Sequence, residues 1–330
     1  MTDNELAVQA NGLVKRFGDF TAVDGIDLAV KTGEVFGVLG PNGAGKTTML
    51  KMLATLLPID GGNASIFGID VASNSHKIRQ LVGVTGQYAS VDENLTGYEN
   101  LWLFGKLQGL SSTDSKKTAN DLLERFGLTE AANRQIQNFS GGMRRRLDLA
   151  ASLISRPPLI FLDEPTTGLD PRTRGQMWDT IRDLVRDGAT VLLTTQYLDE
   201  ADQLADRIAV IDRGIKVAEG TSDELKAGVG TSTLHIRLTN RDRTPQAVAL
   251  VAAALGEQPA MTPESGGLSI GLSDANQAAD VLIALRQADL PIATAEVRQP
   301  TLDEVFMALT GHHSDSEDQE SQDRDERVAR

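Results

Sequence analysis

Short apolar runs separated by turn residues occupy most of the chain, and their pattern divides it into segments. In residues 1–36, strand-like runs alternate with glycine-containing turns, which predicts an antiparallel sheet; the runs lie at 6–8, 13–16 and 26–30. Residues 90–138 instead carry apolar side chains at spacings of three and four, the period of a helix. Later runs are almost continuously apolar, as in parallel strands covered on both faces; they lie at 159–162, 190–194 and 208–211.

The pattern changes again near residue 228, where the segment Gly-Val-Gly-Thr indicates a domain boundary. We expect one domain over residues 1–228, with a helical subdomain at about 90–138, and a small α/β domain over 229–312. In the second domain each strand is followed by a helix; the strands are expected at 234–238, 268–272 and 292–298 and the helices at 245–255, 276–288 and 302–309. Residues 313–330 are acidic and lack an apolar cluster, which predicts a disordered, solubilising tail.

Composition limits the possible partners. With 330 residues, 40% of them hydrophobic, the chain can form buried cores. Its formal charge of −14 argues against nucleic acid as a partner, because binding phosphates requires a basic face. Cysteine is absent, which suits a reducing cytoplasm. No apolar run reaches the ~18 residues of a transmembrane helix, and no signal peptide is recognisable, so we expect any role at a membrane to come through a partner.

A glycine-rich loop, GPNGAGKTT, follows an apolar run at 35–39 and precedes a helical pattern at 48–53. Its glycines let the backbone turn several N–H groups toward one anion, and the helix N-terminus adds its dipole. In this pattern the lysine, Lys46, contacts the β- and γ-phosphates, and the hydroxyl of Thr47 holds Mg²⁺. We therefore expect a phosphate-binding loop made of Gly40, Pro41, Asn42, Gly43, Ala44, Gly45, Lys46, Thr47 and Thr48.

Two acids, Asp163 and Glu164, end the apolar run at 159–162. A buried strand that delivers a carboxylate at its C-terminal end supplies the Mg²⁺-linked acid of a phosphate-loop hydrolase, and Asp163 fits this role. Glu164 is placed to orient or deprotonate the attacking water. We therefore predict that Glu164 and Lys46 are catalytic.

A second glycine turn, Ser140-Gly141-Gly142, precedes a helix expected over residues 144–154. A helix N-terminus behind such a turn is a second place for an anion. Taken alone, the motif is better explained as an ordinary serine N-cap.

In their order along the chain, these motifs resemble those of ATP-binding-cassette (ABC) ATPases, over about residues 6–222. The resemblance implies a P-loop NTPase core with antiparallel and helical subdomains, and binding of ATP and Mg²⁺. It also implies roles for Gln87 at the metal and the helical subdomain, for Asp170 in the D-loop, and for Phe17 stacked on adenine. Residues 139–143, FSGGM, would be the signature motif, which is LSGGQ in most of the family. Because a signature binds the γ-phosphate held by another subunit, an ATP sandwich with a second copy of the chain or a paired cassette is implied.

One position departs from that family. After the run at 190–195 the family places a switch histidine, whereas this chain has Gln196 and carries its four histidines elsewhere. Glutamine can donate a hydrogen bond to a γ-phosphate, but it cannot carry an imidazolium charge. We expect Gln196 to act as a catalytic residue with weaker γ-phosphate sensing, and hydrolysis to persist through Glu164 and Lys46.

Longer segments narrow the resemblance to the daunorubicin-resistance (DrrA-like) ATP-binding subunits of actinobacterial drug exporters; they are residues 84–93, 140–148, 194–202 and 302–311. This resemblance implies an ATPase bound peripherally at the cytoplasmic side of the cell membrane. It would drive efflux of anthracycline-like hydrophobic drugs through a separate multi-pass permease. Alternatives are export of a lipid or another non-drug cargo, import, a non-transport ABC ATPase, and an ATP sensor without turnover.

Two segments allow more than one interpretation. Residues 98–104 lie where relatives receive the coupling helices of the permease, and they also fit a plain helical core. Arg144, Arg145 and Arg146 fit a solvated or phosphate-facing turn after the signature.

Overall fold

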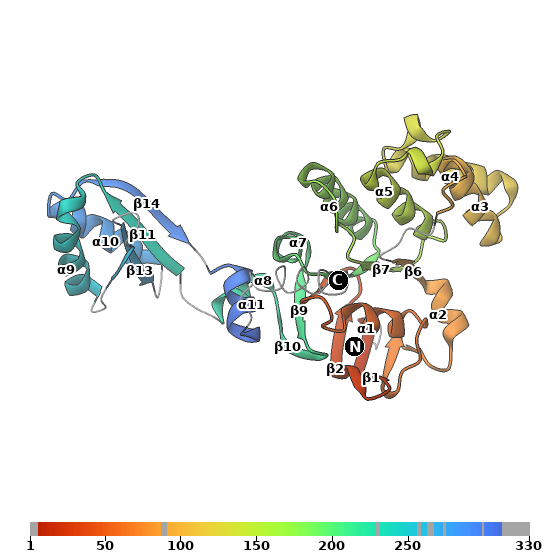
Figure 1. Cartoon of the computed structure of the whole chain (residues 1–330), viewed down its shortest axis with the longest axis horizontal. Coiled ribbons are helices and arrows are strands. Elements are labelled where there is room, and N and C mark those ends of the chain that lie inside the picture. The colour runs from red at the N-terminus through yellow and green to blue at the C-terminus, as the bar shows by residue number, and fades with distance from the viewer. Residues whose placement is uncertain are drawn as a thin grey trace, which may run out of the picture. The chain divides into compact units, whose positions relative to one another are not determined.

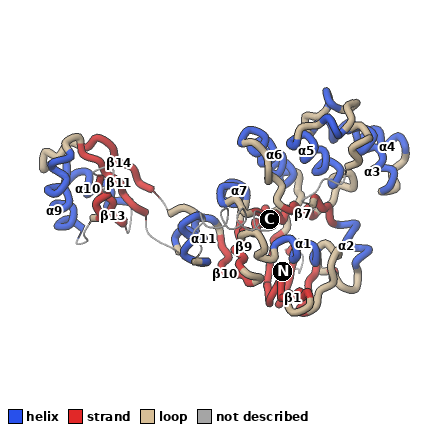
Figure 2. The backbone as a smooth tube through the Cα atoms, in the orientation of Figure 1, coloured by secondary structure: helices blue, strands red, loops and turns tan. Residues whose placement is uncertain are grey.

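The computed structural model describes residues 6–86, 91–228, 232–255, 259–262, 267–272, 275–298 and 300–311 (Figures 1 and 2). Contacts divide the chain into two compact units, residues 1–222 and 223–330, and each is described by itself. The unit boundary falls a few residues before the predicted domain limit at 228, and the predicted domain limits stay predictions. The predicted tail at 313–330 lies outside the described residues.

A six-stranded sheet forms the centre of the first unit, in the order β10-β9-β3-β8-β7-β6. Its strands are β3 (Val35–Leu39), β6 (Val82–Thr85), β7 (Leu159–Asp163), β8 (Thr190–Thr195), β9 (Arg207–Asp212) and β10 (Ile215–Gly220). The first five are mutually parallel, and β10 pairs antiparallel at one edge. Every residue of β3, β7 and β8 is buried, which confirms the parallel, doubly covered strands expected from their continuous apolar runs.

The predicted antiparallel sheet is confirmed in a four-stranded sheet of order β2-β1-β4-β5. Its strands are β1 (Leu6–Phe17), β2 (Phe20–Lys31), β4 (Gly61–Ile66) and β5 (Ile69–Asp70). The runs predicted at 6–8 and 13–16 are both parts of β1, which continues through them with irregular register. Helix α1 (Lys46–Leu53) shares one apolar core with this sheet and with one face of the central sheet, while α2 (Ser75–Leu81) adds Ile78 to it.

Helices cover the opposite face of the central sheet. They are α5 (Gly141–Ser152), α6 (Pro171–Arg186) and α7 (Leu198–Leu204). Helices α3 (Gly97–Leu107) and α4 (Ser112–Arg125) pack on each other and on α5, and short 3-10 turns lie at Thr129–Ala131 and Ile136–Asn138. Along β7 the alternation of side chains is plain, because Leu159 and Phe161 face the core of α1 whereas Ile160 and Leu162 face the helices. Helix α5 begins at Gly141, not at the predicted 144, because Ser140 caps it.

The second unit begins within α8 (Ser222–Ala227) and holds a four-stranded antiparallel sheet of order β12-β13-β11-β14. Its elements are β11 (Ser232–Leu238), a 3-10 turn (Arg241–Arg243), α9 (Thr244–Leu255), β12 (Ala260–Thr262), β13 (Gly267–Leu272), α10 (Ala275–Gln287), β14 (Ile292–Arg298) and α11 (Leu302–Thr310). From β11 to β14 the order βαββαβ, with this strand arrangement, is the ferredoxin-like split βαβ fold. The expected three strand–helix pairs therefore missed β12, and the sheet is antiparallel throughout.

Packing in the second unit places α9 and α10 on one face of its sheet. Alternate residues of β11, including Leu234 and Ile236, are buried with Val251 of α9 and Val281 of α10. No described helix of the chain is both long and apolar enough to cross a membrane.

Candidate functional site

The glycine-rich loop joins β3 to α1, and its shape excludes side chains at two positions. A Cβ atom on Gly40 would lie 2.1 Å from the carbonyl oxygen of Ile211. One on Gly45 would lie 2.3 Å from the carbonyl oxygen of Ala22, and Gly45 has φ of +100°. Only glycine fits both positions, so the tight wrap expected from the sequence has a direct steric cause.

The loop leads directly into the N-terminus of α1. Gly45 is the N-cap residue, and no side chain caps the helix. The first backbone N–H groups of a helix have no partner within the helix, and its dipole favours an anion there. This is the arrangement that binds phosphates at a loop–helix junction.

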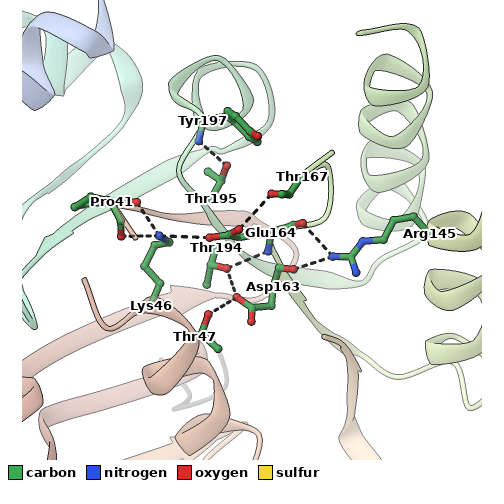
Figure 3. A network of polar contacts seen from close by, with 11 residues as sticks. Pro41, Lys46, Thr47, Arg145, Asp163, Glu164, Thr167, Thr194, Thr195 and Tyr197 are labelled. Carbon is green, nitrogen blue, oxygen red and sulfur yellow. Dashed lines mark hydrogen bonds and ion pairs between the residues drawn. The ribbon is translucent and has the colours of Figure 1, made fainter. Parts of the chain in front are cut away.

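The side chain of Lys46 is buried at the centre of a polar network (Figure 3). Its Nζ donates to the carbonyl oxygens of Gly40 at 2.7 Å and Pro41 at 2.9 Å. It lies 3.6 Å from Oε1 of Glu164, an ion pair in which both side chains are less than a tenth exposed. Burial lowers the pKa of Lys46, and the charges of Glu164 and Asp163 oppose that shift.

Asp163, at the end of β7, is joined to two threonines. Thr47 Oγ1 donates to Asp163 Oδ1 at 2.9 Å, and Thr194 Oγ1 donates to the same oxygen at 2.6 Å (Figure 3). Carboxylate and hydroxyl oxygens are hard ligands that suit Mg²⁺, which proteins bind through one or two carboxylates together with substrate phosphates. The pair Thr47 and Asp163 therefore fits the predicted metal position.

Glu164 has an unusual backbone, with φ of +48°, in the left-handed region. Its N–H is directed at Thr194, 3.1 Å from the carbonyl oxygen and 3.2 Å from the hydroxyl. Its Oε2 accepts a hydrogen bond from Thr167 Oγ1 at 3.2 Å. A strained backbone that its surroundings hold in place is common at catalytic positions, and here it presents the Glu164 carboxylate to Lys46.

Gln196 follows β8 directly and is half-buried. Among the described residues, no hydrogen bond or ion pair joins Gln196 to Lys46 or Glu164. Tyr197 fixes the neighbouring turn. Its N–H donates to Thr195 Oγ1 at 2.9 Å, and the Arg174 guanidinium carbon lies 4.8 Å from the centre of its ring. The other predicted metal residue, Gln87, lies outside the described residues.

The second glycine turn is packed against the next helix. Ser140 Oγ accepts a hydrogen bond from the N–H of Met143, so it is a true N-cap of α5. A Cβ on Gly142 would lie 2.4 Å from Thr173 Cγ2, and Thr173 is itself held by the predicted D-loop acid, Asp170, which caps α6. Around Gly141 the space is open. No described hydrogen bond or ion pair joins Ser140, Gly141 or Gly142 to Lys46.

Phe17 ends β1, and its ring is 48% exposed. Lys15 Nζ lies 5.5 Å from the ring centre, and Phe20 is its partner across the hairpin. Phe20 is 63% exposed and was not singled out from the sequence, although its place directly after the same two-residue turn could have indicated it. The exposed ring of Phe17 at the end of β1 is free to stack on a base, and that role stays a prediction.

The three arginines after the predicted signature do not share the solvated or phosphate-facing surroundings that were expected for them. Arg144 pairs at the surface with Glu93 at 2.7 Å, and Arg146 donates to the carbonyl oxygen of Phe126. Arg145 is turned inward and donates to backbone carbonyls of the loops after β6 and β7. For Arg145 the expectation was wrong, because a run of three like charges gives no sign that one of them is buried.

The aromatic segment of α3 is part of the helical core. Tyr98, Trp102 and Phe104 are partly buried and pack against the cluster that contains Leu101. This packing accounts for their apolar character, and a docking role for the segment stays a prediction.

Comparisons with known proteins agree with this geometry. Residues 23–167 match the family model of the ABC transporter, and residues 220–310 match that of the C-terminal domain of DrrA1-3-like ATP-binding proteins. The chain is 51% identical to the daunorubicin/doxorubicin resistance ATP-binding protein DrrA of Streptomyces peucetius, over 98% of each chain. It is 42% identical to the doxorubicin resistance ATP-binding protein DrrA of Mycobacterium tuberculosis, over 96% of this chain and 97% of that protein.

A solved structure extends the match to the fold. The ATP-binding cassette MJ0796, in a dimeric post-hydrolysis state bound to ADP and Pi, is 26% identical, with a TM-score of 0.60 over 65% of this chain and 98% of that one. The glycine loop, the buried Lys46–Glu164 pair and the predicted signature turn thus occur on a cassette fold. The chain belongs to the DrrA-like ATP-binding proteins of the ABC transporter family.

Proposed function

We propose that this ABC ATPase couples ATP hydrolysis to the efflux of hydrophobic, anthracycline-like drugs through a separate multi-pass membrane permease. The observation that carries the proposal is the network in which Lys46, Thr47, Asp163 and Glu164 meet at the end of the glycine loop. The names of relatives that align over nearly the whole chain supply the cargo class. The alternatives are export of a lipid or another non-drug cargo and a non-transport ABC ATPase.

The chain's own groups have distinct tasks in hydrolysis. The N–H groups at the start of α1 bind the phosphates, and Lys46 turns from the carbonyls of Gly40 and Pro41 toward the β- and γ-phosphates. Glu164 orients the attacking water and accepts its proton. Thr47 and Asp163, with Gln87, would hold Mg²⁺, which neutralises charge on the phosphate oxygens. Gln196, following β8, would donate a hydrogen bond to the γ-phosphate.

A second copy of the chain would complete each site. In this arrangement Ser140, Gly141 and Gly142 of one copy face the γ-phosphate held by the other, and Asp170 lies at the interface. Support comes from Gly141, which is exposed with open space around it, and from the dimeric state of the solved cassette. The adenine would stack on Phe17.

The remaining assignments are also part of the proposal. The chain would sit at the cytoplasmic side of the cell membrane, held there by its permease. Residues 1–228 would form the nucleotide-binding domain, 229–312 an accessory domain, and 313–330 a disordered acidic tail.

Replacing Glu164 tests the catalytic assignment. We expect Glu164→Gln to lower steady-state ATPase activity by about 100-fold or more, because the amide cannot accept the proton from water. Binding of a fluorescent ATP analogue should persist. Full activity in Glu164→Gln would exclude Glu164 as the catalytic group.

Transport is tested in cells that express the chain with its permease. We expect wild-type cells to accumulate less doxorubicin than cells carrying Glu164→Gln. Equal accumulation, together with normal ATPase activity of the purified wild type, would favour the lipid or non-transport alternatives.

A further inference from the structure

Arg145, in the second turn of α5, donates hydrogen bonds to four backbone carbonyls outside its own helix. Its Nη2 lies 2.8 Å from the carbonyl oxygen of Asp163 and 3.0 Å from that of Glu164. Its Nε lies 3.0 Å from the carbonyl oxygen of Pro165, and its Nη1 2.5 Å from that of Gly86 (Figure 3 shows the first two contacts). The side chain is only 11% exposed. Asp163 is the last residue of β7, and the other three carbonyls belong to residues that follow the ends of β6 and β7.

Only arginine can make this set of contacts. Its planar guanidinium presents five N–H donors in a fixed fork, whereas lysine carries a single ammonium on a flexible stem. Burial lowers the pKa of Arg145, and the carboxylates of Asp148, Asp163, Glu200 and Glu164 oppose that shift. A guanidinium stays protonated in proteins, so Arg145 brings a positive charge to this cluster of carbonyl oxygens.

The contacts fix the residue on which hydrolysis depends. Glu164 sits at φ of +48° and is bound through its N–H by Thr194. Arg145 holds the carbonyl on the other side of the same residue, so the two ends of the Glu164 backbone are fixed from different elements. The direction of the Glu164 carboxylate toward Lys46 follows from that backbone.

Arg145 also lies on the helix that carries the signature turn. Ser140 caps α5, and Arg145 is little more than one turn further along the same helix. A displacement of the turn along α5 would therefore move Arg145 and, through it, the carbonyls of Glu164 and Gly86. Gly86 is the residue directly before the predicted Q-loop residue, Gln87.

We propose that Arg145 is a positioning residue that aligns Glu164 from the signature helix and so couples the two ATP sites of the dimer. ATP held by one copy contacts the signature turn of the other copy, whose Arg145 then adjusts that copy's own Glu164. This inference rests on the proposed ATP sandwich and on hydrolysis through Glu164. It predicts a loss of turnover without a matching loss of ATP binding.

The test compares Arg145→Lys and Arg145→Ala with Arg144→Lys in the full chain. Arg144 is a matched control, because it neighbours Arg145 on α5 but contacts Glu93 and the carbonyl oxygen of Ile136 instead of the carbonyls after β6 and β7. Three quantities are measured: steady-state kcat as a function of ATP concentration, the Kd of a fluorescent ATP analogue, and the melting temperature. Methylguanidine is added to Arg145→Ala to restore the missing group.

We expect both Arg145 variants to lose about 10- to 100-fold in kcat, the size of effect that a misplaced catalytic group produces, while Kd changes by less than about threefold. Any sigmoidal dependence of the wild-type rate on ATP concentration should become hyperbolic. Methylguanidine should restore part of the activity of Arg145→Ala and none of that of Glu164→Gln. Arg144→Lys should resemble the wild type.

Two results would overturn the inference. One is a wild-type kcat in Arg145→Lys; the other is a parallel loss of kcat, ATP affinity and melting temperature that methylguanidine does not relieve, which describes a merely structural residue. If Arg145→Ala fails to fold, Arg145→Lys still decides between these outcomes. Failure of the proposed function is recognised separately, because the wild type would then lack ATPase activity or Glu164→Gln would retain it.

Discussion

Among single residues, Gln196 differs from the histidine that the ABC family places after this strand. We expect Gln196→Ala to lower kcat by at least about tenfold, because a hydrogen-bond donor to the γ-phosphate is lost. Gln196→His should retain activity but acquire a pH dependence near pH 6.5, where imidazole titrates and glutamine does not. ATPase rates of the three proteins between about pH 5.5 and pH 8 check this. Parallel pH profiles for wild type and Gln196→His would place residue 196 away from the phosphate.

Glu200 gives a second prediction at this scale, through stability. It is fully buried on α7, and Trp178 Nε1 donates to its Oε1 at 3.2 Å. Burial raises the pKa of the Glu200 carboxyl above its usual 4.5. Because the folded pKa is the higher one, the folded state binds this proton more tightly than the unfolded state. The resulting stability is full below the unfolded pKa and is lost as pH rises through the folded pKa.

Glu200→Gln removes this titration and keeps the oxygen that accepts from Trp178. The stability of the wild type relative to Glu200→Gln should therefore fall as pH rises from about 4.5 toward neutral. Urea unfolding of both proteins over this range measures the difference. If the free energies of unfolding of the two proteins change in parallel with pH, the pKa of the Glu200 carboxyl is not raised by folding.

At the scale of elements, the junction of α5 and α6 depends on Gly142. We expect Gly142→Ala to destabilise the fold by about 1–3 kcal/mol, because its Cβ would lie 2.4 Å from Thr173 Cγ2. Adding Thr173→Ser removes that methyl group and keeps the hydroxyl that binds Asp170. Gly141→Ala, with open space around it, is the control. The melting temperatures of the variants measure the effect. If Thr173→Ser does not restore the stability lost in Gly142→Ala, the strain does not come from the Thr173 methyl group.

Elements with a strong local pattern could be predicted from the sequence, and those defined by distant partners could not. The strand at 35–39 and the strand ending at Asp163 follow from continuous apolar runs. Strand β4 begins Gly61-Gly62-Asn63 and depends on pairing with β1, and β12 is three residues long and depends on β13. Neither has an apolar period of its own to mark it.

The same division holds for the site. The glycine-loop residues and the acids Asp163 and Glu164 could be predicted from the sequence, because their chemistry requires particular residue types at particular spacings. Arg145 and Glu200 do not, since a buried charged residue is recognised only by the partners that surround it. The ion pair between Lys46 and Glu164 likewise joins residues far apart in the chain.

At the scale of the whole molecule, the proposed transport requires a surface that meets the permease. The predicted docking segment, 98–104, packs into the helical core, so substituting Trp102 would disturb packing and docking together. Leu107, at the end of α3, is 73% exposed. Substituting it therefore tests docking without disturbing the packing of the core. Leu103, four residues earlier on α3, is 38% exposed, so the two leucines lie on one face of the helix and could together contact a partner helix.

We therefore expect Leu107→Asp to reduce doxorubicin efflux strongly while the ATPase activity of the isolated chain stays within about twofold of wild type, because exposed substitutions barely change stability. Leu56→Asp, at a position 59% exposed that directly follows the α1 region, is the matched control and should leave both quantities unchanged. Efflux and ATPase activity are measured for all three proteins. Normal efflux in Leu107→Asp would place the permease contact elsewhere, and an equal loss of efflux in both variants would show that the effect of the charge is not local to α3.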